Sequence, residues 1–203
     1  MILLGVTGGI GMGKSVSLGI LEGLGVPCVD TDAVARSCTA PGSDGLAAVV
    51  AAFGRGVLDE SGSLRRSRLA EIVFGDAGAR ERLEAILHPR IGAVWRSQVA
   101  TWRRDGCSRA AVIIPLLFEK GYEAEFSSVV CLACTGTSQQ RRLEQRGWTP
   151  PQIASRNAAQ WPVVEKMKRA RFVVWTEGSL DCHRKQWERI LDRDAASISG
   201  FPA

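Results

Sequence analysis

The sequence predicts an α/β fold in which helices flank a five-stranded parallel sheet. Short apolar runs recur along the chain and alternate with longer segments of helical periodicity, which is typical of parallel sheets buried on both faces. The chain has 203 residues and is 45% hydrophobic, enough to bury a full core. The runs expected to form strands are residues 2–6, 26–29, 110–114, 128–133 and 172–175.

The first strand is followed by a glycine-rich segment, Gly8-Gly9-Ile10-Gly11-Met12-Gly13-Lys14-Ser15, and then by a helix beginning at Lys14. This segment matches the phosphate-binding pattern G-x-x-x-x-G-K-[ST] in the strand-loop-helix setting that the pattern requires. Glycines let the backbone curl so that its N–H groups converge on a phosphate. Lys14 is expected to contact the β- and γ-phosphates of a nucleotide, and Ser15 to bind Mg²⁺.

Two other interpretations of this segment compete with a phosphate-binding loop. A glycine-rich turn with an exposed lysine would carry no ligand. A dinucleotide-binding loop is the closer competitor, because the acidic Asp30 follows about twenty residues later, as that fold requires. However, the glycines do not form G-x-G-x-x-G in any register, and Lys14 and Ser15 would have no purpose in such a loop.

Composition limits the classes of partner. The net charge of +5 suits an anionic ligand, but the basic residues do not form one block, so charge alone does not indicate nucleic acid. No apolar run reaches the roughly 18 residues that a membrane span needs. The six scattered cysteines are expected to be reduced, and Cys131 and Cys134 not to share a metal or a disulfide. We expect a cytoplasmic protein, monomeric or weakly self-associating, with no membrane or nucleic-acid partner.

The second strand ends in Asp30-Thr31-Asp32. In a parallel α/β sheet the ligand lies beyond the C-terminal ends of the strands, so carboxylates here face the phosphate loop. One of these residues could cap the following helix, and another could act as a general base toward a substrate hydroxyl. We favour Asp30 or Thr31 at the cap and Asp32 in the site.

Residues 41–104 are expected to form a helical insertion, a substrate-binding lobe between the second and third strands. Arg66, with Arg65 and Arg68, could meet an acidic substrate or could simply be solvated. His88 precedes Pro89, which disfavours a helical conformation at His88 and should bend or end the helix there. A lone histidine is more often structural than catalytic.

A basic helical hairpin is predicted over residues 136–160, after the fourth strand. Residues 135–138 read as a capping turn, and Thr149-Pro150 restarts a helix. Arg142, Arg146 and Arg156 could meet the charge of a transferring phosphoryl group, or the hairpin could be an exposed basic pair of helices. The remaining segments, 1–40, 105–135 and 161–203, form the predicted nucleotide-binding core.

Together these segments resemble the dephospho-CoA kinase family over residues 2–191. The resemblance rests on an ordered set of motifs: residues 6–15, 29–32, 64–66, 69–74, 83–89, 115–119, 140–143 with 146, and 156–160. It implies a P-loop NTPase core with a five-stranded parallel sheet, a helical CoA-binding lobe and a lid. It also implies transfer of phosphate from ATP, with Mg²⁺, to the 3′-hydroxyl of dephospho-CoA, the last step of coenzyme A synthesis.

The resemblance assigns roles to individual positions. Asp32 would be the base for the ribose 3′-hydroxyl, assisted in catalysis by Lys14 and Arg142. Substrate binding would further involve Arg66, His88 and Arg156. The positions assigned to the nucleotide are Gly8, Gly11, Met12, Gly13, Lys14, Ser15, Val16 and Arg146, with Ser15 on the metal.

Four positions depart from the family pattern. Ile113 stands where an acid is frequent, Val16 where threonine is frequent, Arg171 for aspartate and Trp175 for asparagine. These changes could weaken Mg²⁺ or α-phosphate contacts and alter the adenine side of the site. Two alternatives therefore remain beside an active dephospho-CoA kinase: another small-molecule or nucleotide kinase with the same core, and a catalytically degenerate nucleotide-binding relative.

Overall fold

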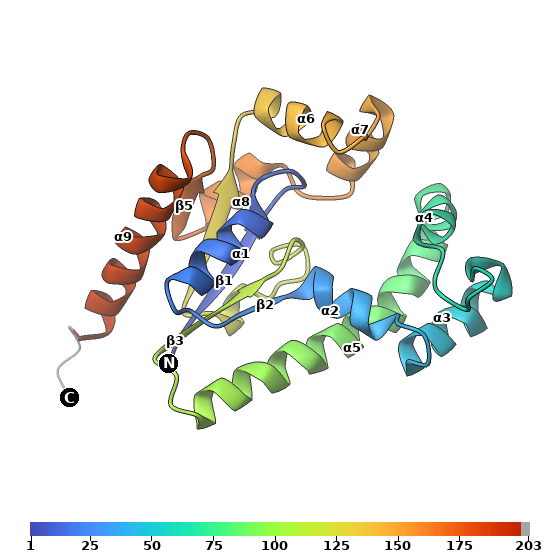
Figure 1. The fold of residues 1–203 in the computed structure, drawn as a ribbon, viewed down its shortest axis with the longest axis horizontal. Helices are drawn as coiled ribbons and strands as arrows, with labels where there is room; N and C mark the ends of the chain where they lie inside the picture. Colours follow the sequence, from blue (N-terminus) through green and yellow to red (C-terminus); the bar gives the residue numbers. More distant parts are fainter. Residues whose placement is uncertain (200–203) are drawn as a thin grey trace. The chain divides into compact units, whose positions relative to one another are not determined.

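The structure, a computed structural model, describes residues 1–199 (Figure 1). The chain divides into two compact units. The first combines Met1–Asp30 with the chain from Trp102 onward, and the second is Thr31–Thr101. Among the described residues, none of the helices combines the length and apolar character needed to cross a bilayer.

A five-stranded parallel sheet forms the centre of the first unit, with the strand order β2-β3-β1-β4-β5 (Figure 1). The predicted α/β class and the number of strands in the sheet are confirmed. The strands are β1 (Ile2–Gly8), β2 (Cys28–Asp30), β3 (Arg109–Ile113), β4 (Ser128–Ala133) and β5 (Phe172–Trp175). The central strands β1 and β4 are almost continuously buried, which explains their uninterrupted apolar sequences.

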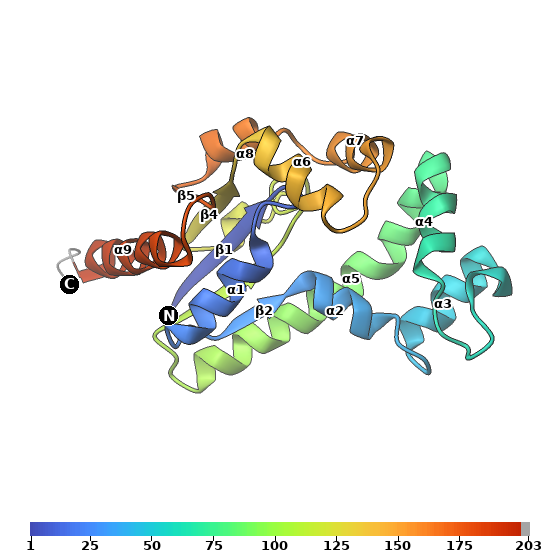
Figure 2. The ribbon, with the colours of Figure 1, turned by 45° about the horizontal axis from the view of Figure 1, so that its top comes forward.

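Helices cover the two faces of this sheet. Helices α1 and α9 pack against each other, and α9 also packs against β5, whereas α8 packs against β4 and β1 (Figure 2). The helices of the first unit are α1 (Lys14–Gly23), α6 (Gly136–Glu144), α7 (Pro150–Ala158), α8 (Val163–Arg169) and α9 (Leu180–Ser199), with a 3-10 turn η2 (Glu123–Glu125).

The side chains of β1 alternate between the two faces, as those of a strand must. Leu4 and Val6 belong to the core that also contains Leu21 of α1 and Trp187 of α9. Gly5 lies between them and is in close contact with the segment after β3 on the other face. Because α1 and α9 share a hydrophobic core with β1, they fix the strand from which the glycine-rich loop departs.

The second unit is helical, as predicted. Its helices are α2 (Thr31–Cys38), α3 (Asp44–Phe53), the 3-10 turn η1 (Arg55–Val57), α4 (Arg66–Gly75) and α5 (Ala77–Arg104), which continues into the first unit. Its core is built around Val49, Val57 and Leu69. An isolated β-bridge joins Leu58 to Leu64 and closes the loop before α4.

The expectation that His88 is not helical is wrong. Helix α5 runs through Pro89 without ending, and His88 is helical. Proline removes one backbone N–H from the helix, but the flanking turns continue the hydrogen-bonded ladder on both sides. The Arg90 guanidinium also donates to the Ile86 carbonyl at 2.6 Å, close to the interruption. Pro89 therefore does not end the helix.

Gly5 provides a test of this packing. A Cβ at position 5 would lie 2.7 Å from Leu117 Cδ1 and 2.8 Å from Phe126 Cδ2. We expect Gly5→Ala to lower the free energy of unfolding by about 1–3 kcal/mol through overpacking. Gly19→Ala is the matched control, because Gly19 is an exposed position in α1 with no neighbouring atom within 4 Å of its Cβ site. Gly19→Ala should raise the free energy of unfolding by about 0.5–1 kcal/mol. Denaturant unfolding measures both, and equal effects would contradict this account of Gly5.

Candidate active site

The glycine-rich loop adopts the conformation that its sequence predicts. Gly11 and Gly13 have φ angles of 70° and 85°, in the left-handed region, and Gly13 is the N-cap of α1. The loop is also closely backed: a Cβ on Gly11 would lie 3.0 Å from Leu143 Cγ, and one on Gly13 would lie 3.1 Å from Thr176 Cβ. Only glycine satisfies both constraints, and the loop opens onto the N-terminus of α1, where anions bind.

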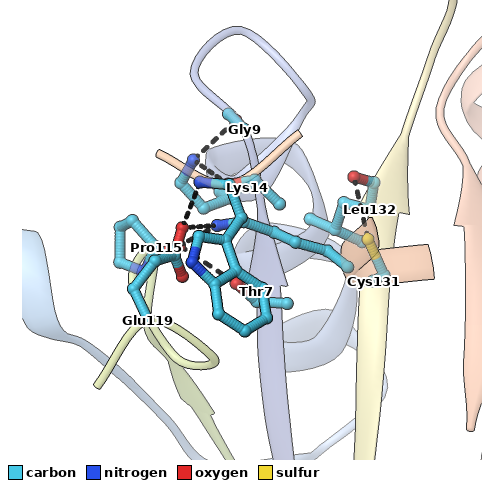
Figure 3. Close-up of polar contacts among 10 residues, drawn as sticks. Thr7, Gly9, Lys14, Pro115, Glu119, Cys131 and Leu132 are labelled. Atoms are coloured by element: carbon cyan, nitrogen blue, oxygen red, sulfur yellow. Dashed lines mark hydrogen bonds and ion pairs between the residues drawn. The ribbon is translucent and has the colours of Figure 1, made fainter. Parts of the chain in front are cut away.

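Lys14 and Ser15 begin α1 directly behind this loop. The Lys14 ammonium donates to the carbonyl oxygens of Gly8 at 3.0 Å and Gly9 at 2.8 Å, which holds its charge against the loop (Figure 3). Ser15 and Val16 are exposed in the first turn of α1, whereas Met12 is buried. The first turn therefore presents a cation and a hydroxyl beside the glycine backbone.

Arg142 joins the loop to the segment after β5. Its guanidinium donates to the Gly11 carbonyl at 3.3 Å and to the hydroxyl of Thr176 at 2.9 Å, and it also donates to the Thr176 carbonyl. Thr176 is itself buried. The guanidinium is thus held beside the phosphate loop by groups from two distant parts of the sequence.

Sequence reasoning missed Gln139, which also contacts the loop. This buried side chain donates to the Ile10 carbonyl at 2.8 Å and to the Asn157 side-chain oxygen at 3.1 Å. It therefore connects the tip of the loop to both α6 and α7. The only sequence signal was its position immediately before the Gln140-Arg141-Arg142 motif, three residues before Arg142 and on the same face of the helix.

A pocket of about 170 Å³ adjoins the loop within the first unit. Its walls come from the loop, the start of α1, the α6 region and the segment between β5 and α9. The lining residues are Gly11, Gly13, Val16, Arg142, Arg146, Thr176, Gly178, Ser179, Leu180 and His183. The predicted site residues that line this one pocket are Gly11, Gly13, Val16, Arg142 and Arg146.

His183 is a further residue of this pocket that sequence reasoning did not identify. Its Nε2 lies 3.0 Å from the hydroxyl of the buried Ser17, one helical turn beyond Gly13. Burial lowers the pKa of His183, and the positive charge of Arg142 lowers it further. The imidazole is therefore neutral at physiological pH, and its hydrogen bond to Ser17 ties α9 to α1.

Glu177 fixes the start of α6. Its carboxylate accepts from the Thr135 N–H at 2.9 Å and from the Thr135 hydroxyl at 2.5 Å, and it accepts from the Trp175 indole N–H at 3.0 Å. Thr135 is the N-cap of α6, as predicted, and its hydroxyl accepts from the Ser138 N–H. Hydrogen bonds from Ser138 and Thr135 lower the pKa of Glu177 to about 2.

The end of β2 lies at the same level of the sheet as Val6, two residues before the end of β1. Asp30 pairs with Ile113 of β3, and Val6 of β1 pairs with the same Ile113 from the other side. Two strand spacings of about 4.8 Å then separate Asp30 from Val6. Asp32 follows two residues later, exposed in the first turn of α2 and at the beginning of the second unit.

The remaining predicted site residues lie in different places. Arg66 is the first residue of α4, and its guanidinium donates to the Thr39 hydroxyl at 3.0 Å within the second unit. His88 is half-buried in α5 of the same unit. Arg156 lies in α7 of the first unit, with its guanidinium 4.2 Å from the centre of the Trp148 ring.

Comparison with known proteins decides which family has this architecture. A family model described as dephospho-CoA kinase matches residues 2–181. The dephospho-CoA kinase of Geobacillus kaustophilus is 37% identical over 191 residues, which span 94% of this chain and 95% of that relative. The chain belongs to the dephospho-CoA kinase family. The resemblance inferred from the sequence motifs is therefore confirmed.

Other relatives agree with this family assignment. The dephospho-CoA kinase of Anaeromyxobacter dehalogenans is 40% identical over 192 residues, 94% of this chain and 91% of the relative. The crystal structure of TT1252 from Thermus thermophilus has a TM-score of 0.81 at 31% identity, covering 95% of this chain and 97% of that chain. A shikimate kinase from Acinetobacter baumannii shares the fold alone, with a TM-score of 0.53 at 13% identity.

The four residues that depart from the expected dephospho-CoA kinase pattern lie in different parts of the first unit. Ile113 is fully buried between β1 and β2, and Val16 is exposed in the wall of the pocket. Trp175 contributes its indole N–H to Glu177, and Arg171 donates to the Ser128 hydroxyl at 3.3 Å. Trp175 thus takes part in positioning the segment that begins at Thr176.

The cysteines are free, including the Cys131 and Cys134 pair. Burial raises the pKa of Cys131 to about 11, although Lys166 and Lys14 oppose this shift. Burial likewise raises the pKa of Cys134. Both thiols are therefore protonated at neutral pH and are poor nucleophiles.

The Glu177 carboxylate predicts a pH-dependent contribution to stability. Its pKa of about 2 in the folded protein lies below the ordinary value of 4.5. The charged form therefore stabilises the fold above pH 4.5, and this contribution is lost as pH falls from 4.5 toward 2. We expect Glu177→Gln to lower stability at pH 7 and the difference from the unmodified protein to disappear by about pH 2.

Thermal unfolding between pH 2 and pH 7 measures this difference. Glu188→Gln is the control, because Glu188 forms an exposed i,i+4 pair with Arg184 at 3.0 Å. Such pairs contribute little, about 0.3–0.5 kcal/mol. A Glu177→Gln protein as stable as the Glu188→Gln protein at pH 7 would contradict the role assigned to Glu177.

Proposed function

We propose that this chain catalyses the reaction of its family, the ATP-dependent phosphorylation of the 3′-hydroxyl of dephospho-CoA to give CoA and ADP. The observation that carries the proposal is the closely backed glycine loop in front of α1, with the Lys14 ammonium held against it. The family assignment names the acceptor.

The phosphate groups of ATP would lie against the loop from Gly8 to Val16. The backbone N–H groups at the N-terminus of α1 would bind phosphate oxygens, and Lys14 would neutralise charge on the β- and γ-phosphates. Arg142 is held beside Gly11 by three of its five donors, and the others can turn toward a phosphate. The base and ribose of the nucleotide would enter the pocket that Arg146 and His183 line.

Mg²⁺ fits this site by the chemistry of its donors. The exposed Ser15 hydroxyl is a hard oxygen ligand next to Lys14, and Mg²⁺ prefers such ligands together with substrate phosphates and water. When bound, the ion would neutralise charge that develops on the phosphate oxygens. Val16 supplies only its backbone N–H at the following position, where threonine would add a hydroxyl.

Asp32 is the proposed base for the acceptor hydroxyl. It is exposed, and it follows within two residues of the end of β2, which lies at the level of Val6 just before the loop. Its carboxylate would hold the 3′-hydroxyl by a hydrogen bond and accept its proton as the oxygen attacks the γ-phosphorus. Arg66 and His88 are proposed to contact dephospho-CoA from the second unit.

We also propose that the α6–α7 segment with Arg156 is a lid. Gln139 and Arg142 support this role, because they join the segment to the loop at Ile10 and Gly11. The proposal keeps the cytoplasmic location and the monomeric or weakly associated state predicted from the sequence. Small molecules, ATP and dephospho-CoA, are its proposed partners.

An assay of ADP release with ATP and Mg²⁺ tests the reaction. We expect turnover of dephospho-CoA at about 1–100 s⁻¹, and no comparable turnover of AMP. Preferred turnover of AMP would identify a nucleotide kinase with the same core. ATP binding in calorimetry without turnover of any acceptor would identify the degenerate relative, which the buried Ile113 in place of an acid motivates.

Two substitutions separate the proposed roles. Lys14→Ala should reduce kcat/KM by about 10²-fold or more, because it removes the cation nearest the transferring phosphate. Asp32→Asn should lower kcat by about 10²–10⁴-fold and leave ATP affinity within about twofold, because it removes the base but not the cradle. Steady-state kinetics and calorimetry measure both effects. Full turnover by Asp32→Asn would remove the base assignment.

A further inference from the structure

A buried polar cluster lies beneath the phosphate loop and has no part in the mechanism above. It involves the motif Pro115-Leu116-Leu117-Phe118-Glu119, which the family resemblance singled out and to which no role was given. Figure 3 shows Pro115, Glu119 and Thr7 gathered next to Lys14, at the end of β1. The cluster is therefore positioned to influence the end of β1, from which the loop departs.

Lys166 of α8 is the centre of this cluster. It is completely buried, which is rare for a lysine and requires that its charge be compensated. Its ammonium donates to the Pro115 carbonyl at 2.7 Å and forms an ion pair with Glu119 Oε1 at 2.7 Å. Helix α8 packs on β4 and β1, so this cation reaches across the sheet face from α8 to the segment after β3.

The Pro115 carbonyl connects Lys166 to the loop. It accepts a second hydrogen bond from the hydroxyl of Thr7 at 3.1 Å. Thr7 is buried and immediately precedes Gly8, whose carbonyl in turn accepts from Lys14 at 3.0 Å. The buried Lys166 ammonium is therefore linked to Lys14 through the Pro115 carbonyl, the Thr7 hydroxyl and the Gly8 carbonyl. The only covalent link in this path is the one between Thr7 and Gly8.

Glu119 is less completely satisfied. Its Oε1 also accepts from the Trp161 N–H at 2.8 Å, and the Trp161 ring stacks on that of Phe118 with centroids 6.5 Å apart. Its Oε2 is buried and has no hydrogen-bond partner within the described part of the chain. A buried ion pair with an unsatisfied oxygen contributes little stability compared with apolar side chains of similar volume. A contribution to stability therefore does not by itself explain why Lys166 and Glu119 form a buried ion pair.

We propose that Lys166 is a positioning residue for the phosphate loop. By holding the Pro115 carbonyl it fixes Thr7, and by fixing Thr7 it holds the end of β1 at the position from which Gly8 to Gly13 can surround the phosphates. This inference rests on the proposed function, because it assigns to Lys166 an effect on ATP binding. Lys166 itself contacts neither ATP nor the acceptor.

The test separates positioning from stability. Replacing Lys166 alone leaves the Glu119 carboxylate buried without its cation, which destabilises the fold whatever the role of the pair. The informative protein is therefore the double variant Lys166→Met with Glu119→Gln, which removes both charges and keeps side chains of similar size. Lys168→Met is the matched control, because Lys168 lies on the same helix in an exposed pair with Glu165.

Three quantities are measured for each variant: the thermal unfolding midpoint, the Kd for ATP with Mg²⁺ by calorimetry, and the KM for dephospho-CoA. The double variant should unfold near the midpoint of the unmodified protein. Its Kd for ATP should nevertheless rise by about 10-fold to 100-fold, since small displacements of binding groups have effects of this size. The KM for dephospho-CoA should change by less than about twofold. Lys168→Met should leave all three unchanged.

Thr7→Val decides the question if the double variant does not fold. It introduces no charge, keeps the shape of the side chain and removes only the hydroxyl that donates to Pro115. A weaker ATP complex at an unchanged midpoint supports the proposal. Unchanged ATP affinity in either folded variant overturns it. Because calorimetry with ATP requires no turnover, failure of the proposed reaction is recognised separately, by the absence of product from the unmodified protein.

Discussion

The phosphate loop depends on one constraint: the backbone must turn sharply between a buried strand and the first turn of a helix. Gly11 and Gly13 provide this turn through left-handed φ angles, and Leu143 and Thr176 approach them too closely to admit a side chain. The hydrophobic core holds β1 and α1 on either side, so that the loop has little freedom to relax. The nucleotide pocket, the position of the Lys14 ammonium and the contacts of α6 all follow from this turn.

The sequence predicted those parts of the molecule that short-range patterns determine. The apolar runs located the strands because the sheet is buried on both faces, and the Gly8 to Ser15 motif located the glycine loop before α1 because its geometry is local. The capping signals also held: Thr135 caps α6, and Gln152 accepts from the Thr149 N–H at the start of α7. The catalytic role of Asp32 and the role of the α6–α7 segment as a lid stay predictions.

Other features depended on contacts between distant residues, which a single sequence does not show. Gln139 contacts Ile10 across 129 positions, and Lys166 contacts Pro115 across 51. A lysine in a polar helix predicts an exposed side chain, so the buried position of Lys166 had no local signal. Pro89 was misjudged for a related reason, because the helical turns on both sides override the local preference for a break.

Hydrogen bonds hold the Arg142 guanidinium against Gly11 and Thr176. An arginine that must be immobilised when its ligand arrives reduces affinity by about 0.5–1.5 kcal/mol of lost side-chain entropy. Here folding has restricted the guanidinium beforehand, since a buried threonine holds it in place. In the proposed complex, the triphosphate would therefore meet an arginine whose side-chain entropy has already been lost on folding.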